Sequence, residues 1–120
     1  MPEELYTKKE YQSLLLKTLG RSPKLKVLDF FLDNPLTDFT KKEVMEALGM
    51  SKQTFYRCWQ ELEKSSTVKV TRRVRRATMY QLDRENEVVK QLIKLDMALA
   101  RSAMEKAVEE YKKPVAVKSR

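Results

Sequence analysis

Two groups of polar side chains could do chemistry in this chain: the first combines cations, amides and hydroxyls, and the second consists of arginines. The first group is Ser51, Lys52, Gln53, Thr54, Tyr56, Arg57 and Gln60. The second group is Arg72, Arg73, Arg75 and Arg76. Arginine fits the base edge of guanine and glutamine that of adenine, whereas lysine and tyrosine suit phosphate oxygens. Hydroxyls at the start of a helix commonly hold a phosphate. These residue types indicate contact with double-stranded DNA.

The distribution of charge along the chain favours the same interpretation. The net charge is +8, and residues 52–81 carry eight basic and two acidic side chains, which leaves +6 in that segment. Residues 1–51 are neutral, with eight charges of each sign, and residues 82–120 hold nine basic and seven acidic groups. A positive bias alone usually means only solubility, so a merely solvated face remains the alternative.

The composition lacks the residues and motifs that form common enzyme active sites. The chain has no histidine, two glycines and one cysteine, so histidine bases, histidine metal ligands, a glycine-rich phosphate loop and an internal disulfide are all absent. We therefore expect no catalytic residues, no metal and no cofactor. Cys58 and Trp59 are expected to be core residues. The apolar runs are too short to span a bilayer, and we find no secretory signal. We therefore expect a cytoplasmic protein associated with a nucleoid or plasmid.

Four predicted helices and a hairpin position these side chains. A helix is expected over 3–19, and a second from Ser22-Pro23 to Pro35. The capping box Thr40-Lys41-Lys42-Glu43 starts a short helix that carries Val44, Ala47 and Leu48 and ends at Gly49. Ser51 then caps a helix over 52–64 whose inner face carries Phe55, Trp59 and Leu62.

Beyond Ser66 the period becomes two, which predicts a β-hairpin. Val68, Val70 and Val74 alternate with polar residues, a second alternating run covers 78–82, and the turn lies near Arg75-Arg76. Two short helices followed by a basic hairpin are the order of a winged helix-turn-helix. In such a fold the second helix enters the major groove, and the hairpin lies along the DNA backbone or in the minor groove.

The chain resembles archaeal winged-helix DNA-binding proteins over about residues 20–96. The motifs are Gly20-Arg21-Ser22-Pro23-Lys24-Leu25-Lys26-Val27-Leu28-Asp29-Phe30, Ser51-Lys52-Gln53-Thr54-Phe55-Tyr56-Arg57 and Tyr80-Gln81-Leu82. Within that group it looks most like the site-binding adaptor proteins of archaeal plasmid partition systems. The resemblance implies that the chain coats a DNA site and recruits other segregation components. One departure is Met45, where the helix-turn-helix motif usually has a small residue.

The final predicted helix, over 87–113, supports self-association. An apolar stripe on it comprises Val88, Leu92, Leu95, Leu99 and Ala103. Twenty-seven residues span about 40 Å, which is longer than a winged-helix body of this size can cover. A second copy of the chain would cover the surplus apolar face and offer two recognition helices to a two-fold DNA site.

The predicted fold is mainly α with a small β-hairpin, a winged helix-turn-helix with additional N- and C-terminal helices. The domains are an N-terminal helix at 1–20, a DNA-binding domain at 21–83, a dimerisation helix at 84–113 and a tail at 114–120. The expected function is DNA binding as a homodimer, either in transcription regulation or in plasmid partition, with other transcription or segregation proteins as further partners and no membrane. The alternative is a scaffold whose winged helix binds an acidic protein.

Overall fold

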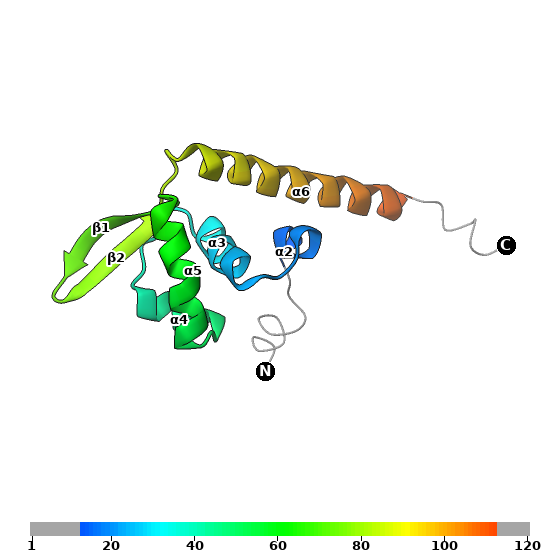
Figure 1. The fold of residues 1–120 in the computed structure, drawn as a ribbon. Helices are drawn as coiled ribbons and strands as arrows, with labels where there is room; N and C mark the ends of the chain where they lie inside the picture. Colours follow the sequence, from blue (N-terminus) through cyan, green and yellow to red (C-terminus); the bar gives the residue numbers. More distant parts are fainter. Residues whose placement is uncertain (1–12, 113–120) are drawn as a thin grey trace.

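Five helices and a two-stranded hairpin follow one another in the part of the chain that the computed structural model describes, residues 13–112 (Figure 1). In order they are α2 (Leu14–Leu19), α3 (Pro23–Asp33), α4 (Lys41–Leu48), α5 (Lys52–Lys64), β1 (Val68–Val74), β2 (Ala77–Leu82) and α6 (Glu87–Lys112). The order of α3, α4, α5 and the hairpin confirms the predicted winged helix-turn-helix. The expected start of the first helix at residue 3 and the tail at 114–120 lie outside the described residues.

Local capping explains where the helices of the body begin. The Ser22 hydroxyl accepts a hydrogen bond from the Leu25 amide at 3.2 Å. At α4 the capping box is complete, because the Thr40 hydroxyl accepts from the Glu43 amide at 3.0 Å and the Glu43 carboxylate accepts from the Thr40 amide at 2.8 Å. Gly49 ends α4 in the left-handed conformation, with φ 61° and ψ 33°, where a side chain would be strained.

The hydrophobic core is centred on Trp59 of α5. Its ring stacks on Phe55 with centroids 5.3 Å apart and meets the edge of Tyr80 from β2 at 4.9 Å. Phe31 of α3 completes the cluster at 6.0 Å. Trp59 is almost fully buried and Cys58 is buried beside it, so both expectations for these residues are confirmed. Because this core clamps one face of α5, the opposite face of the same helix is held toward solvent.

The hairpin is antiparallel and is anchored to the body by one further bridge. Val68 pairs with Leu82 and Val74 with Ala77, so the turn predicted near Arg75-Arg76 consists of these two residues. The register shifts between Val70 and Arg72, so the residue between them is a β-bulge. The backbones of Phe39 and Tyr80 exchange hydrogen bonds of 2.8 and 2.7 Å, which joins the segment before α4 to β2.

Three details differ from the sequence-based predictions. The helix expected over 3–19 is not continuous, because Ser13 has extended backbone angles and caps α2. The Ser13 hydroxyl binds the Leu16 amide and so offers the backbone a helix start within the expected helix. Ala47, which the sequence groups with Val44 and Leu48 on the same helix, is exposed, whereas Val44 is fully buried. Val70 and Val74 are exposed because the hairpin extends beyond the core.

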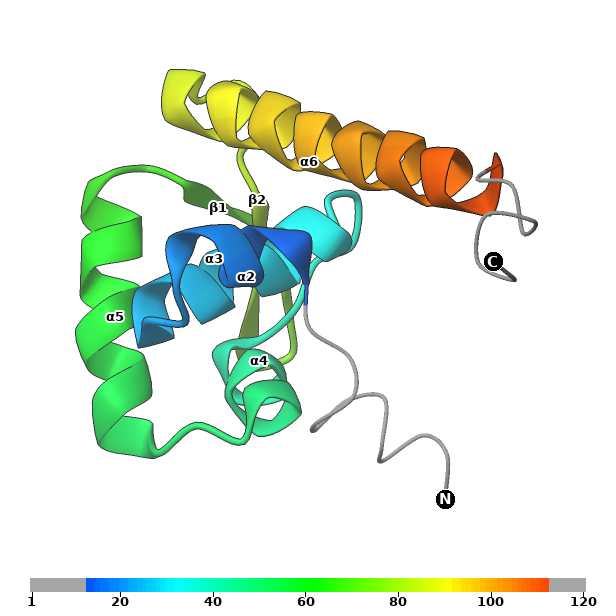
Figure 2. The same ribbon diagram turned by 90° about the vertical axis from the view of Figure 1, so that its right-hand side faces the viewer.

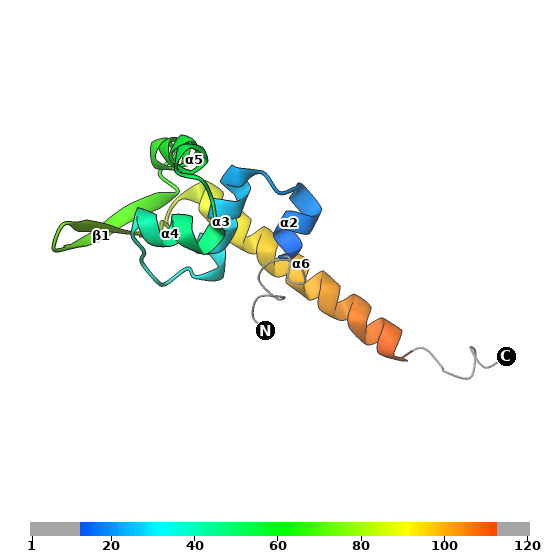
Figure 3. The same cartoon turned by 90° about the horizontal axis from the view of Figure 1, so that it is seen from below.

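The long helix α6 crosses the body on the side away from α4 and runs on beyond it. Figures 2 and 3 show α6 passing over α2 and α3, with its C-terminal turns projecting past α2. Val89 is fully buried, and Leu92, Ile93, Leu95 and Leu99 are partly buried against the core of the same chain. Within residues 13–112, none of the helices combines the length and the apolar character needed to cross a bilayer.

Candidate nucleic-acid interface

The predicted recognition residues lie on the solvent side of α5. Its inner face is formed by the buried Phe55, Cys58, Trp59 and Leu62. The opposite side exposes Ser51, Lys52, Gln53, Tyr56, Arg57 and Gln60, while Thr54 is half-buried. The Ser51 hydroxyl accepts a hydrogen bond from the Thr54 amide at 3.2 Å, so it is engaged as a helix cap. The structure therefore brings the predicted set together along one helix face.

Acidic side chains on α5 stand away from its N-terminal turns. Glu61 and Glu63 both lie in the second half of the helix. Glu61 forms an ion pair with Lys24 of α3, with 3.1 Å between the Lys24 Nζ and the Glu61 Oε1. Lys52 and Arg57 form no ion pair within the described part of the chain. The N-terminal half of α5 is consequently the more positive one.

Lys41 is a cation near this face that the sequence analysis did not select. Its ammonium lies 5.5 Å from the ring centroid of Tyr56 on α5 and 5.6 Å from that of Tyr80 on β2. It also lies 5.8 Å from the ring centroid of Trp59. Cation–π attraction at these distances joins α4, α5 and the hairpin. The local signal was Lys41 at the first position of a capped helix, which says nothing about the distant aromatic rings.

The four wing arginines are not equivalent. Arg73, Arg75 and Arg76 are exposed and make no ion pair with any described residue. Arg75 has φ 60° in the two-residue turn, an uncommon conformation for a residue with a side chain. Arg72 instead donates from Nε to Asp38 Oδ2 at 3.0 Å and from its terminal nitrogen to Oδ1 at 3.3 Å. The structure thus separates Arg72 from the other three.

A cluster of carboxyl groups lies where α3 meets α6. Asp29 is buried, and its Oδ1 has no hydrogen-bond partner. Burial raises the pKa of Asp29, a hydrogen bond from Ser13 opposes that rise, and the nearby Asp96 carboxylate adds to it. Burial, with Asp29 and then Asp96, raises the pKa of Asp33 to about 6. Among residues 13–112 no group of three or more acidic or cysteine side chains is placed to hold a metal ion.

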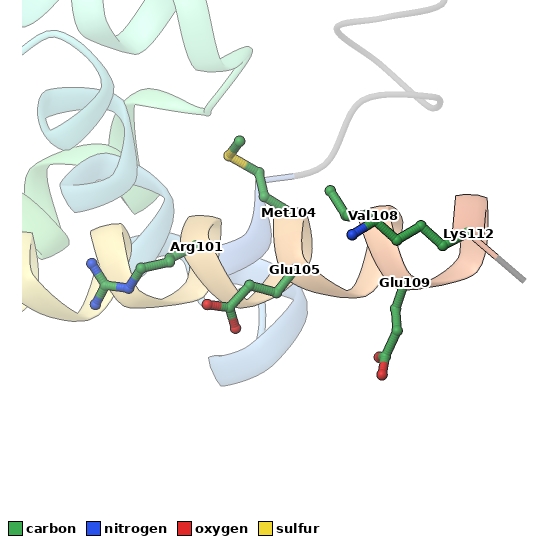
Figure 4. A pocket seen from close by; sticks show the side chains of 6 residues that line it. All are labelled: Arg101, Met104, Glu105, Val108, Glu109 and Lys112. Atoms are coloured by element: carbon green, nitrogen blue, oxygen red, sulfur yellow. The ribbon is translucent and has the colours of Figure 1, made fainter.

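The stripe predicted as a dimer interface is largely turned toward its own chain. Leu92, Leu95 and Leu99 are partly buried against the core, Ala103 is half-buried, and Val88 is exposed. The free apolar surface of α6 lies elsewhere and comprises Met97, Met104, Val108 and Tyr111, which are 59, 67, 50 and 91% exposed; we call these residues the outer stripe. Figure 4 shows Met104 and Val108 on the projecting turns, beside Arg101, Glu105, Glu109 and Lys112.

Three solved structures have a similar fold. NadR in complex with 4-hydroxyphenylacetate aligns with a TM-score of 0.55 at 15% identity, over 98% of this chain and 82% of that one. A possible transcriptional regulator from Methanosarcina mazei Go1 aligns with a TM-score of 0.51 at 13% identity, over 83% and 87% of the two chains. A MarR-family transcriptional regulator from Silicibacter pomeroyi DSS-3 gives 0.50 at 14% identity, over 90% and 72%. No family model and no curated protein sequence matches the chain. These likenesses establish the winged-helix fold.

Proposed function

We propose that this chain is a sequence-specific double-stranded DNA-binding protein that regulates transcription in the cytoplasm. The observation that carries the proposal is α5: its aromatic face is fixed in the core, and the opposite face presents Lys52, Gln53 and Arg57 to solvent. A basic wing stands beside it, and Arg73, Arg75 and Arg76 in this wing form no ion pair with residues 13–112. Two of the three similar structures are described as a possible transcriptional regulator and as a MarR-family transcriptional regulator, which supports this function.

In the proposed complex, α5 and the wing would contact different parts of the DNA. The N-terminal turns of α5 would enter the major groove, where Arg57 can bind guanine O6 and N7 and Gln53 can bind adenine N6 and N7. Arg73, Arg75 and Arg76 would contact phosphates or an adjacent minor groove, because they are exposed and no described acidic residue pairs with them. Residues 21–83 would form the DNA-binding domain.

A homodimer would form through α6, within the proposed dimerisation segment 84–113. The outer stripe has the spacing of a helix pair, since Met97, Met104 and Tyr111 are seven residues apart and Val108 lies between the last two. A second copy covering this stripe would remove four large side chains from water in each chain. The wing and the free end of α6 project from opposite ends of the body (Figures 1 and 3), so dimerisation would leave both DNA-binding surfaces open.

A role as a plasmid-partition adaptor would use the same DNA chemistry. It rests on the resemblance of the sequence motifs, and it differs from regulation in how many dimers bind a DNA of given length. Counting bound dimers along duplexes of increasing length separates the two roles. A regulator saturates at one or two dimers, whereas an adaptor that coats its site binds in proportion to length.

Salt-dependent binding tests the proposed function. Log affinity for duplex DNA should fall linearly with log salt concentration, by roughly 0.9 for each phosphate neutralised. Replacing Arg75 and Arg76 by alanine should weaken binding to every duplex and flatten that slope. Replacing Lys17 on α2 and Lys106 on α6 by alanine removes the same charge away from the proposed DNA and dimer surfaces and should leave the slope unchanged. A wild-type affinity that does not respond to salt would contradict the proposal and favour binding of a protein partner.

A further inference from the structure

The ion pair between Asp38 and Arg72 differs from the other two in residues 13–112. Asp38 accepts three hydrogen bonds: from Arg72 at 3.0 and 3.3 Å, and from the Thr71 hydroxyl at 2.6 Å. The pairs Lys24–Glu61 and Lys90–Glu87 each have a single contact, and all four of their side chains are 43% or more exposed. The Asp38 side chain is only 18% exposed. Hydrogen bonds from Arg72 and then from Thr71 lower the pKa of Asp38, so its carboxylate stays charged.

The β-bulge makes this contact possible. Val70 pairs with Tyr80 and Arg72 with Met79, so Thr71 is the extra residue of β1. In a regular strand, neighbouring side chains point to opposite faces, and Thr71 and Arg72 could not reach one acceptor. A bulge places two residues opposite one and re-aims the side chains. Here both donors converge on the same carboxylate.

Asp38 also lies where the hairpin joins the helix-turn-helix formed by α4 and α5. Its neighbour Phe39 forms the backbone bridge to Tyr80 of β2, and the next residue, Thr40, caps α4. Beyond Val70 the side chains of β1 are exposed. Among the described residues, Asp38 is the only hydrogen-bond partner that the β1 side chains have outside the hairpin.

We propose that Asp38 is a positioning residue for DNA binding. It latches β1 through Thr71 and Arg72, so that Arg73, Arg75 and Arg76 meet the DNA in one orientation relative to α5. Because its guanidinium is occupied by the latch, Arg72 makes no phosphate contact. This inference rests on the proposed function, since it assigns a role within the same DNA interface.

Arg72 and Arg73 form a matched pair for the experiment. Both are exposed arginines in β1, and replacing either by alanine removes one charge. Affinity is measured against salt concentration by fluorescence anisotropy, with a labelled mixed-sequence duplex and a duplex obtained by binding-site selection. Arg73→Ala should reduce the salt slope by about 0.9 per chain, the value for one lost phosphate contact. Arg72→Ala should leave the slope unchanged.

Asp38→Ala gives a result that a purely stabilising role would not produce. The freed Arg72 becomes available to phosphates, so the slope should steepen by up to about 0.9 per chain, and the mixed-sequence duplex should bind more tightly. The unlatched wing no longer fixes the register of α5, so the affinity ratio of selected to mixed duplex should fall about tenfold, as for one weakened base contact. In the double variant Asp38→Ala/Arg72→Ala, the slope should return to the wild-type value.

Two outcomes would refute the proposed positioning role of Asp38. An Arg72→Ala slope reduced as far as that of Arg73→Ala would make Arg72 a phosphate contact. Equal losses on both duplexes in Asp38→Ala would leave Asp38 without a positioning role. Circular dichroism and thermal melting of each variant verify that the fold is intact. Failure of the wild type to bind either duplex would refute the proposed function together with the latch, whereas the two outcomes above refute the latch alone.

Discussion

Charged substitutions on the outer stripe of α6 should separate the proposed dimer into monomers. Met104 and Val108 are half to two thirds exposed in the single chain. Complete burial of such a side chain is worth about 1.5–3 kcal/mol, so covering the exposed parts of both residues in both chains contributes roughly 4–7 kcal/mol. Replacing both by glutamate forfeits this contribution and places like charges opposite each other. The dissociation constant should rise by about three to five orders of magnitude.

Sedimentation equilibrium across a range of protein concentrations measures this change. Val88→Glu is the matched control: Val88 is a similarly exposed residue of α6, but it lies about 160° round the helix from Met104. The control should remain dimeric. A wild-type mass of one chain, 14.2 kDa, at micromolar concentration would refute the dimer. Dissociation caused by Val88→Glu and not by the Met104 and Val108 substitutions would instead place the interface on the stripe that contains Val88.

Three further perturbations test other parts of the structure. Thr40→Ala removes the hydroxyl of the α4 capping box and should lower the free energy of unfolding by about 1 kcal/mol in urea denaturation, whereas Thr37→Ala in the preceding turn should change it little. Burial raises the folded-state pKa values of Asp29 and Asp33, so both carboxylates destabilise the fold when they are ionised. The free energy of unfolding should therefore increase as pH falls from 7 toward the ordinary aspartate pKa near 4. Asp29→Asn should raise the melting temperature at pH 7 and weaken that pH dependence; a wild type that loses stability over this range would contradict the assignment. Arg57→Ala should cost about 1–3 kcal/mol of binding free energy on the selected duplex and clearly less on mixed sequence, and equal losses would make Arg57 a phosphate contact.

The features that the sequence predicts well are those determined by neighbouring residues. The capping box at Thr40, the left-handed Gly49 and the cap at Ser51 depend on side chains within three residues of the backbone they bind. The inner face of α5 follows from helical spacing, because a stripe containing Phe55 and Trp59 must be buried. The position of the wing turn follows from the end of the alternating pattern.

Features that depend on distant partners were not predictable from the pattern. Asp38 and Arg72 are 34 residues apart, and the bulge that brings them together has no signal in the alternating run. The pattern of α6 contains both an inner and an outer apolar stripe, but only the packing of α6 against α2 and the core shows which stripe its own chain covers. Val70 and Val74 have the alternation of buried strand residues, yet the body ends before it reaches them.

The projecting half of α6 affects how the helix forms. Its first half is held by Val89 and Ile93, while none of the residues 100–112 belongs to the set packed against the core. Nucleating a helix is the costly step, and extending it fixes one residue for each new hydrogen bond. Residues 101–112 alone would be a marginal helix in water, so their order is propagated from the turns docked on the body. Amide exchange should accordingly quicken along α6 toward Lys112, and a partner on the outer stripe would level that gradient.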